Sequence, residues 1–253
     1  MRRTSVWDVN ITVVGASGLI GSTLVELLNG AGHRVVGASR STGLDVLTGD
    51  GLAAALADAD ALVDVTNSPS FADDDVMAFF TTSTTNLVAA ARDAGVGHYV
   101  ALSIVGTDRL PDSGYLRAKV AQEKLITGSG LPYSIVRATQ FQEFAEAITA
   151  SLTVGTEVRV PDARIQPIAA RDVAAEVAEV AAGTPLNGIV NIGGPDKMSF
   201  ADMARIVLAK QGSENGAAKA VIVDPAATYF GTVVDDDSLV TGDDAKLTAT
   251  KFA

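Results

Sequence analysis

The stretch Gly15-Ala-Ser-Gly-Leu-Ile-Gly21 joins an apolar, β-branched run to an amphipathic one. The preceding run, Ile11-Thr-Val-Val14, has the composition of a buried strand. After the stretch, apolar residues recur at helical spacing until Gly30 and Gly32 end the pattern. A chain that turns sharply from a strand into a tightly packed helix needs glycine, and the N–H groups at the start of that helix favour a diphosphate. This context indicates a dinucleotide-binding turn rather than a plain structural corner.

Beyond this turn, apolar strands alternate with helical patterns, as in right-handed β-α-β units around a parallel sheet. The sequence predicts an α/β fold with a doubly wound parallel sheet, which is a Rossmann fold. The expected strands are Ile11–Val14, Arg34–Ala38, Ala61–Val65, His98–Leu102 and Tyr133–Arg137. The expected helices lie near Gly18–Gly30, Gly51–Ala57, Asp74–Ala94 and Tyr115–Thr127.

From about Thr139 onward the regular alternation is lost. We expect a single domain over residues 1–253, with a dinucleotide-binding core at 10–138 and a small C-terminal substrate-side lobe, mainly 139–253, interleaved with the core. The elements expected there are short strands at Thr156–Val160, Arg164–Ile168 and Val221–Asp224, a helix near Arg171–Ala182, a segment Gly188–Ile192 that rejoins the sheet, and a helix from the capping box Ser199-x-x-Asp202 through Gln211.

Composition excludes several classes of protein. The formal net charge of −11 would repel a phosphate backbone, so we expect no direct nucleic-acid partner. No apolar run is long enough to span a bilayer, which favours a cytoplasmic protein with no membrane partner. Cysteine is absent, and the acidic residues show no convergent ligand spacing, so neither a thiolate nucleophile nor a metal site is predicted. The expected partner is a small-molecule substrate, and the expected state is a monomer or homodimer.

The end of the second expected strand bears on the choice of cofactor. NAD-preferring proteins of this fold generally place an acidic residue there, whereas this chain has Ala38-Ser-Arg-Ser41. The Arg40 guanidinium, with the Ser39 hydroxyl beside it, could hold a 2′-phosphate through forked, charge-assisted hydrogen bonds. NADP(H) is therefore favoured over NAD(H). Arg40 could instead be a solvated loop residue, and Asp45 could bind the adenine or the ribose.

Thr66 and Asn67 follow the third expected strand. Loops at the carboxyl ends of parallel strands line the ligand crevice of this fold, so both residues could meet the ribose or phosphates of the cofactor. The run Asn67-Ser-Pro-Ser70 is equally what a turn needs.

Ser103, Tyr115 and Lys119 are the candidate catalytic residues. Ser103 follows the fourth expected strand, and a spacing of four puts Tyr115 and Lys119 on one helical face. An ammonium beside a phenol stabilises the phenolate, so Tyr115 could act as an acid–base group while Ser103 orients a substrate carbonyl. The alternative is an exposed helix with one amphipathic tyrosine. Ser113 has the setting of a turn or helix cap.

Several segments together resemble the atypical short-chain dehydrogenase/reductases of the NmrA-like branch. They are Gly15–Gly21, Ser103-Ile-Val-Gly106, Tyr115–Leu125, Leu131–Phe141, Gln166–Val173 and Asn191–Pro195. The resemblance implies a nicotinamide dinucleotide with its pyrophosphate at Gly15, Ser17, Gly18, Leu19 and Ile20 and its adenosine end at Ser39 and Arg40. It further implies that Lys119 holds the nicotinamide ribose and that Ala138 to Phe141, Thr139 included, lie beside the nicotinamide.

The resemblance leaves two functions open. One is an NADPH-dependent oxidoreductase that transfers a hydride to a small carbonyl or quinone-like substrate. The other is a non-catalytic NADP(H)-sensing regulator, since the branch contains both kinds and many of its sensor-like members lack the tyrosine. The presence of Tyr115 and Lys119 favours the enzyme.

The remaining polar and aromatic candidates are weaker. His33 and His98 are expected to be structural or solvated, and Arg137 to form a structural ion pair. The pair Tyr229-Phe230 could wall the substrate pocket, although an apolar pair of this kind is more often part of a core.

Overall fold

The computed structural model describes residues 9–212 and 219–253. The chain forms two compact units, each made of several segments. The first unit holds the described part of Met1–Leu102 together with Ala121–Val136 and Ala174–Ile189. The second unit holds Ser103–Val120, Arg137–Val173 and the described part of Val190–Ala253. The chain therefore passes between the two units several times.

The main sheet has seven strands in the order β12-β9-β5-β4-β3-β1-β2. Pairing is parallel between β1 and β2, β1 and β3, β3 and β4, and β9 and β12. The strands are β1 (Asn10–Val14), β2 (Arg34–Ala38), β3 (Ala61–Asp64), β4 (His98–Ile104), β5 (Tyr133–Ala138), β9 (Gly188–Gly193) and β12 (Lys246–Leu247). This arrangement confirms the predicted α/β fold with a doubly wound parallel sheet.

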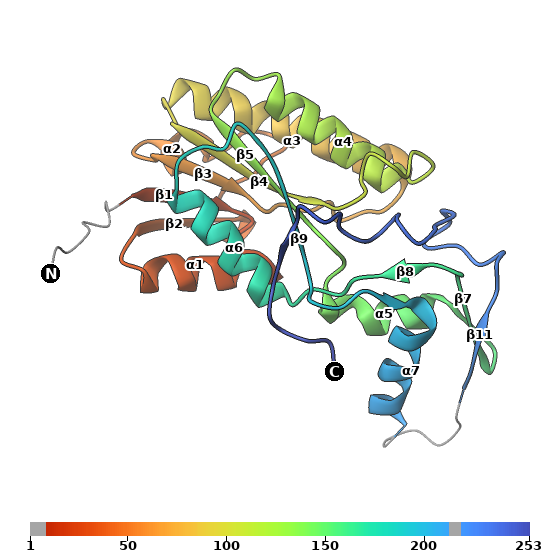
Figure 1. Cartoon of the computed structure of the whole chain (residues 1–253). Helices are drawn as coiled ribbons and strands as arrows, with labels where there is room; N and C mark the ends of the chain where they lie inside the picture. Colours follow the sequence, from red (N-terminus) through yellow and green to blue (C-terminus); the bar gives the residue numbers. More distant parts are fainter. Residues whose placement is uncertain (1–8, 213–218) are drawn as a thin grey trace, which may run out of the picture. The chain divides into compact units, whose positions relative to one another are not determined.

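Helices cover both faces of the strands in the first unit. In Figure 1, α1 and α6 lie on one side of these strands and α3 lies on the other. Because both faces are covered, β3 is buried throughout and β1 at four of its five positions, which explains their nearly continuous apolar sequences. The helices are α1 (Leu19–Gly30), α2 (Leu52–Leu56), α3 (Asp73–Asp93), α4 (Gly114–Thr127) and α6 (Ala170–Ala182).

The strand order reverses direction between β1 and β3. From β1 the chain passes to β2 on one side and then returns to β3 on the other. Loops at the carboxyl ends of two such strands diverge and leave room for a ligand in open α/β sheets. Gly15 follows β1 at this point, and Val65 follows β3.

The second unit has small sheets and an apolar core of its own. Strands β6 (Thr153–Val154), β7 (Glu157–Val160) and β11 (Ala220–Val223) form one sheet, and β8 (Arg164–Ile165) pairs with β10 (Met198–Ser199). Helices α5 (Ala145–Ser151) and α7 (Phe200–Gln211) share a buried cluster with β7 and β8 that includes Ile148, Val158, Ile165 and Phe200. The predicted cap at the start of α7 is present, since Ser199 Oγ accepts a hydrogen bond from Asp202 N at 3.0 Å.

Three differences from the predicted elements have local causes. Strand β4 continues to Ile104, and pairing goes on beyond it because Val105 N donates to Ala138 O at 2.9 Å. The prediction that Ser103 follows the strand was therefore wrong, since Ser103 lies inside it. Strand β8 ends at Ile165, two residues before Pro167, which has no N–H for a ladder. Helix α5, with seven residues, is too short for a clear helical period.

None of the helices in the described ranges is both long enough and apolar enough to cross a lipid bilayer.

Candidate functional site

The glycine turn after β1 leaves no room for a side chain at Gly15 or Gly21. Gly15 has a φ of +92°, and a Cβ on it would lie 2.8 Å from Val65 O. A Cβ on Gly21 would overlap the Gly15 carbonyl oxygen. Two backbone bonds, from Gly15 N and Ala16 N to Ala38 O at 3.0 and 3.2 Å, fasten the turn to the end of β2. The backbone is therefore close-packed where β1, β2 and β3 end.

The start of α1 suits an anion. Gly18 is its N-cap, no side chain caps the helix, and its first turn holds no acidic residue. The exposed residues Ser17 and Leu19 thus present backbone N–H groups at the positive end of the helix dipole, without a competing carboxylate in that turn. The N–H of Gly18 is donated to Gly15 O at 3.0 Å. A diphosphate fits this arrangement.

Ser39 and Arg40 follow directly on β2. Ser39 is buried, its N–H donates to Thr42 Oγ1 at 2.9 Å, and its hydroxyl lies 2.8 Å from Ser41 Oγ. The Arg40 side chain is exposed and forms no hydrogen bond or ion pair with another residue that the structure describes. The backbone of the glycine turn is hydrogen-bonded to Ala38, and Arg40 follows Ala38 by two residues. The Arg40 side chain is therefore attached close to the N–H groups of the turn.

Asp45 folds the loop in which it lies. Its Oδ1 accepts hydrogen bonds from Leu47 N at 2.8 Å and Thr48 N at 3.4 Å. Asn86 on α3 donates to the carbonyls of Val46 and Leu47 at 2.9 and 3.0 Å, which fastens the same loop to the helix. These bonds give Asp45 a structural task, and its contact with the adenine or ribose stays a prediction.

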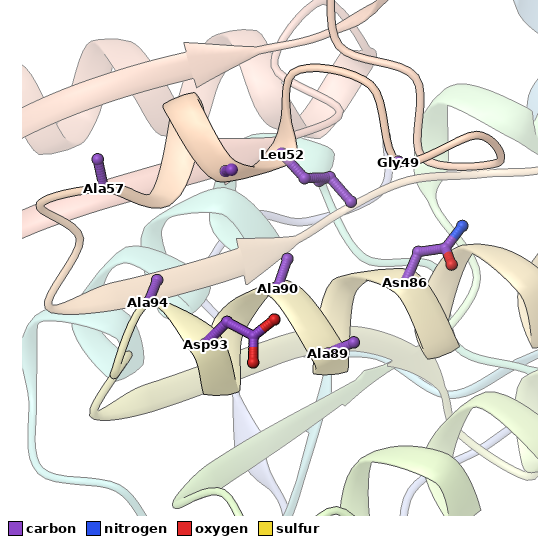
Figure 2. A pocket seen from close by; sticks show the side chains of 9 residues that line it. Gly49, Leu52, Ala57, Asn86, Ala89, Ala90, Asp93 and Ala94 are labelled. Atoms are coloured by element: carbon purple, nitrogen blue, oxygen red, sulfur yellow. The ribbon is translucent and has the colours of Figure 1, made fainter.

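A shallow hollow of about 410 Å³ lies beside this loop, between α2 and α3 (Figure 2). Alanines and the Leu52 side chain line most of it, with Asn86 and Asp93 as the polar members. None of the predicted site residues is among the residues that line it. Gly49, which lines the hollow, donates its N–H to the carbonyl of Asp45 at 2.9 Å.

A buried carboxylate supports the loop after β3. Asp64 Oδ1 accepts hydrogen bonds from Thr66 N at 3.0 Å and Thr66 Oγ1 at 2.7 Å. Its Oδ2 accepts from Tyr99 Oη at 3.1 Å and Gln122 Nε2 at 2.9 Å. Burial, followed by the nearby Asp64 charge, raises the pKa of Tyr99 well above its ordinary value, so its hydroxyl remains a donor. Asp64 thereby fixes the position of Thr66.

Asn67 makes a turn contact, as the alternative interpretation of this segment predicts. Its Oδ1 accepts a hydrogen bond from Ser68 N at 2.9 Å, and Ser68 Oγ accepts one from Ser70 N at 3.2 Å. The contacts of Thr66 and Asn67 with a cofactor stay predictions.

The candidate catalytic residues all belong to the second unit. Tyr115 and Lys119 both lie on α4, one turn apart, as their spacing predicts. Tyr115 is partly buried, whereas Lys119 is 3% exposed and Ser103 is also 3% exposed. Leu116 N donates to Ser113 Oγ at 3.3 Å, which confirms Ser113 as a helix cap. A buried lysine one turn from a tyrosine is an arrangement suited to acid–base work.

The segment after β5 contains a buried hydroxyl that lacks a partner. Thr139 is 1% exposed, its N–H donates to Ile192 O at 3.1 Å, and its Oγ1 forms no hydrogen bond within the described chain. Buried polar atoms are nearly always paired, but other buried hydroxyls of the described chain, including Ser83 Oγ and Thr84 Oγ1 on α3, also form no hydrogen bond. Phe141 stacks on Phe144 with ring centroids 5.5 Å apart. The contact of Thr139 with a cofactor stays a prediction.

A family model described as NAD(P)H-binding matches residues 15–183. The chain belongs to this NAD(P)H-binding family. The match begins at the first glycine of the turn and includes Ser39, Arg40, Ser103, Tyr115, Lys119 and Thr139. No curated protein matches the chain.

Solved structures of sugar-nucleotide enzymes have the same fold as this NAD(P)H-binding protein. The UDP-glucose 4-epimerase of Thermus thermophilus, in complex with NAD, is 19% identical with a TM-score of 0.69, and the match covers 90% of this chain and 89% of that one. MoeE5, in complex with UDP-glucose and NAD, is 19% identical with a TM-score of 0.68 and coverage of 86% and 85%. The UDP-N-acetylglucosamine 4-epimerase of Bacillus cereus is 18% identical with a TM-score of 0.62 and coverage of 85% and 87%.

Two polar contacts of this NAD(P)H-binding protein are absent from the sequence-based predictions, namely those of Asp64 and the bond between Tyr229 and Gln140. Gln140 itself lies in the segment Ala138 to Phe141 that the resemblance places beside the nicotinamide. Asp64 had a usable signal, namely a charged residue within the apolar strand Ala61–Asp64. Gln140 accepts a hydrogen bond from Tyr229 Oη at 2.7 Å, and this partner is 89 residues away in sequence. No local pattern could have paired them.

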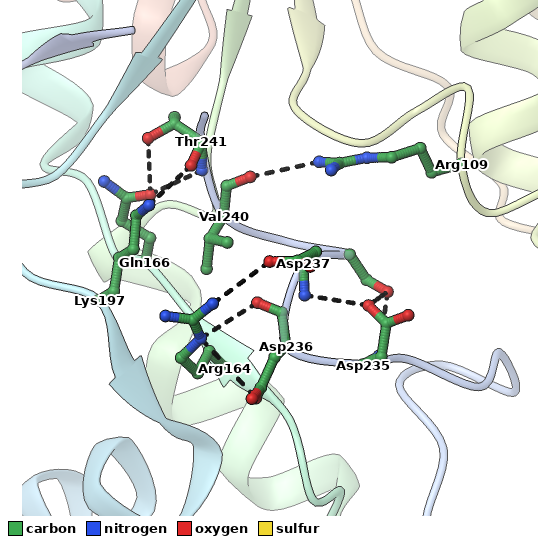
Figure 3. A network of polar contacts seen from close by, with 10 residues as sticks. Arg109, Arg164, Gln166, Lys197, Asp235, Asp236, Asp237, Val240 and Thr241 are labelled. Atoms are coloured by element: carbon green, nitrogen blue, oxygen red, sulfur yellow. Dashed lines mark hydrogen bonds and ion pairs between the residues drawn. The ribbon is translucent and has the colours of Figure 1, made fainter. Parts of the chain in front are cut away.

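The chain that follows Tyr229 is fastened by a polar network within the second unit (Figure 3). Gln166 is fully buried; its Nε2 donates to Gly194 O at 2.7 Å, and its Oε1 accepts from Thr241 N at 2.9 Å. Arg164 pairs with Asp237 at 3.2 Å, and Arg109 donates to Val240 O at 3.2 Å. The segment from Asp235 to Thr241 is therefore held at several points. Arg137 pairs with Asp108 at 3.0 Å, which confirms the predicted ion pair.

Proposed function

We propose that the protein is an NADPH-dependent oxidoreductase of the NmrA-like short-chain dehydrogenase/reductase type, which transfers a hydride to a small carbonyl or quinone-like substrate. The observation that carries the proposal is the placement of Tyr115 and a buried Lys119 one turn apart on α4 of an NAD(P)H-binding chain. A sensor needs a dinucleotide site but no proton donor, so this pair favours an enzyme.

The proposed cofactor contacts come from four segments of the chain. The backbone N–H groups of Ser17, Leu19 and Ile20 bind the diphosphate, and the side chains of Ser39 and Arg40 bind the adenosine end. Lys119 holds the nicotinamide ribose, and Thr139 Oγ1 finds its missing partner in the ligand. The close-packed glycines and the uncapped start of α1, which has no acidic residue in its first turn, support this assignment. Reduced nicotinamide supplies a hydride when it is bound.

Tyr115 is the proposed proton donor. Reduction of a carbonyl adds a hydride to carbon and a proton to oxygen, and the phenol of Tyr115 delivers that proton and regains one from solvent. Lys119 favours the phenolate that remains. Ser103 orients the substrate oxygen from within β4.

Substitution of Tyr115 by Phe tests this role. We expect turnover of NADPH with a panel of quinones, aldehydes and ketones to fall about 100- to 10,000-fold, the usual loss when a general acid is removed. The affinity for NADPH, measured by its fluorescence, should stay nearly unchanged. Tyr133→Phe, which removes a partly buried phenol hydroxyl at the start of β5, is the matched control and should keep full turnover. Unchanged turnover in Tyr115→Phe would exclude the proton-donor role.

The preference for NADP(H) rests on Arg40, whose guanidinium has no ion-pair partner in the described chain. Arg40→Ala should weaken NADPH binding about 10- to 100-fold, as expected for a lost charge-assisted bond to phosphate, and leave NADH binding almost unchanged. Arg34→Ala, at the other end of β2, serves as the control. Equal losses for the two dinucleotides would contradict the assignment of the 2′-phosphate to Arg40.

A further inference from the structure

A two-residue hairpin in the second unit has an unexpected residue at its tip. Tyr229 N donates to Thr232 O at 2.8 Å, and Thr232 N donates back to Tyr229 O at 3.0 Å. The two residues between them, Phe230 and Gly231, have φ values of +45° and +81°. Positive φ at both central positions is the pattern of a type I′ turn. Such turns strongly favour asparagine, aspartate or glycine at the position that Phe230 occupies.

Burial of the side chain does not offset the conformational cost of positive φ at Phe230. The Phe230 side chain is 64% exposed, so little of its apolar surface is removed from water. The other non-glycine residue with positive φ in the described ranges is Asn187, which tolerates the left-handed region far better. A strained, exposed aromatic residue is unfavourable for the fold, and local strain of this kind concentrates where ligands bind.

Packing of Tyr229 fixes the base of the hairpin. Tyr229 packs against the apolar cluster of the second unit, its ring centroid 5.8 Å from that of Phe200 and 4.8 Å from that of Phe230. The rings of Tyr229 and Phe230 meet edge to face, at 71°. On the C-terminal side, the polar network of Figure 3 begins at Asp235, so the chain that follows the hairpin is fixed as well. Phe230 is therefore presented on a supported turn.

The same hairpin approaches the proposed proton donor. Tyr115 and Tyr229 pack against one apolar cluster, and burial, followed by the nearby charge of an ionised Tyr115, raises the pKa of Tyr229. Tyr229 thus keeps its proton and donates it to Gln140 Oε1 at 2.7 Å. The Gln140 amide nitrogen has no hydrogen-bond partner among the described residues, and the side chain is partly exposed. Its N–H groups are available to a ligand.

We propose that Phe230, Tyr229 and Gln140 form a substrate subsite for planar aromatic carbonyl compounds. The flat ring of the substrate stacks on Phe230, and a carbonyl oxygen accepts a hydrogen bond from the Gln140 amide, which Tyr229 orients. This subsite deepens the proposed function and rests on it, because it selects quinone-like compounds over small aliphatic ones within the same reductase. It adds no chemical step to the reduction.

Phe230→Asn separates the ligand role from a structural role. Asparagine suits the turn better than phenylalanine, so the thermal unfolding midpoint should stay constant or rise. For reduction of 1,4-naphthoquinone we expect KM to increase about tenfold with kcat little changed, which is the loss expected when one aromatic stacking contact is removed. For butanal, KM should not change. Val154→Asn, which removes a 64% exposed apolar side chain from β6, should change neither KM.

A second variant tests the orienting bond. Tyr229→Phe keeps the ring and removes the hydroxyl whose hydrogen bond Gln140 accepts, so the KM for naphthoquinone should rise about threefold to tenfold, with the value for butanal constant. An unchanged KM for naphthoquinone in Phe230→Asn, or equal increases for both compounds, overturns the subsite.

Calorimetric titration of 1,4-naphthoquinone into the NADP⁺-loaded protein keeps the two proposals distinguishable. If the wild-type protein binds naphthoquinone and Phe230→Asn binds it about tenfold more weakly, as the loss of one stacking contact predicts, the subsite stands even when no compound is turned over, and only the proposed reductase function fails. If the wild-type protein reduces butanal but does not bind naphthoquinone, the reductase function stands and the subsite is wrong. Equal binding by both proteins also refutes the subsite.

Discussion

The turn at Gly15–Gly21 and the hairpin at Tyr229–Thr232 are both tight, yet they obey opposite rules. At the first turn, glycine occupies the positions where a Cβ would clash, and the backbone is packed against Val65 and Ala38. At the hairpin, a bulky aromatic residue takes up a left-handed conformation while its side chain stays largely exposed. In the proposed function, the first turn binds the cofactor through its backbone, whereas the second offers a side chain to the substrate. Backbone strain therefore points to a ligand site only where close packing does not already explain the strained conformation.

The largest effect is expected where the glycine turn is broken. In Gly21→Ala, the new Cβ would overlap the Gly15 carbonyl oxygen, so turn and helix must separate. We expect the free energy of unfolding to fall by more than about 4 kcal/mol, together with loss of NADPH binding. Urea titration and NADPH fluorescence measure the two quantities.

Gly30→Ala is the matched control on the same helix. A Cβ there meets nothing within 4 Å, and alanine is favoured over glycine in helices, so stability should stay constant or rise by up to about 1 kcal/mol. Comparable losses in the two variants would mean that the crowding at Gly21 is not what constrains the turn.

Acid provides a way to weaken the first unit without altering either turn. His98 is buried at the start of β4 and lies 2.8 Å from Ser134 Oγ, and burial lowers its pKa from 6.5 to about 4. The imidazole of His98 therefore binds a proton more readily in the unfolded chain than in the folded one. The stability that neutral His98 gives the folded state is fully present above pH 6.5 and is lost as the pH falls toward 4. The decrease in the free energy of unfolding approaches about 3 kcal/mol.

Urea titrations between about pH 7 and pH 4, the window over which this histidine titrates, measure the loss. His98→Asn should flatten the pH dependence of the unfolding free energy relative to the parent protein. An identical pH dependence in His98→Asn and the parent would show that other groups cause the acid sensitivity.

The smallest effect is expected at the hairpin. Gly231 has a φ of +81°, but a Cβ on it meets nothing within 4 Å, so Gly231→Ala adds only backbone strain. We expect the unfolding free energy to fall by about 1 kcal/mol, with NADPH affinity unchanged. Gly231→Asn, with a residue that accepts positive φ, should cost less. A loss as large as that of Gly21→Ala would remove the contrast between the two turns.

The sequence was sufficient for the first unit because its signals are local. The glycine turn, the buried strand and the helix that follows occupy the neighbouring residues 10–30, and their spacing alone predicts them. The parallel order β1, β3, β4 and β5 follows from the repeated β-α unit. The helical pair Tyr115 and Lys119 was predictable for the same reason, since four residues separate them.

The second unit was harder to predict because its contacts are distant in sequence. Gln166 bonds to Thr241 across 75 residues, and Gln140 bonds to Tyr229 across 89. In the sequence, the pair Tyr229-Phe230 fits a core better than a pocket wall, because two adjacent aromatic residues are more often buried together. Only the structure separates a half-buried Tyr229 from an exposed Phe230 at positive φ.

The buried carboxylate of Asp64 also determines which ligand atoms the loop after β3 can accept. Both polar hydrogens of Thr66, on its backbone nitrogen and on its hydroxyl, are already donated to Asp64. Thr66 is left with oxygen lone pairs alone, so it can bind only groups that carry a hydrogen of their own. Sugar hydroxyls satisfy that condition, whereas phosphate oxygens do not. With the dinucleotide bound as proposed, the ends of two adjacent strands would present hydrogen-bond donors after β1 and an acceptor after β3.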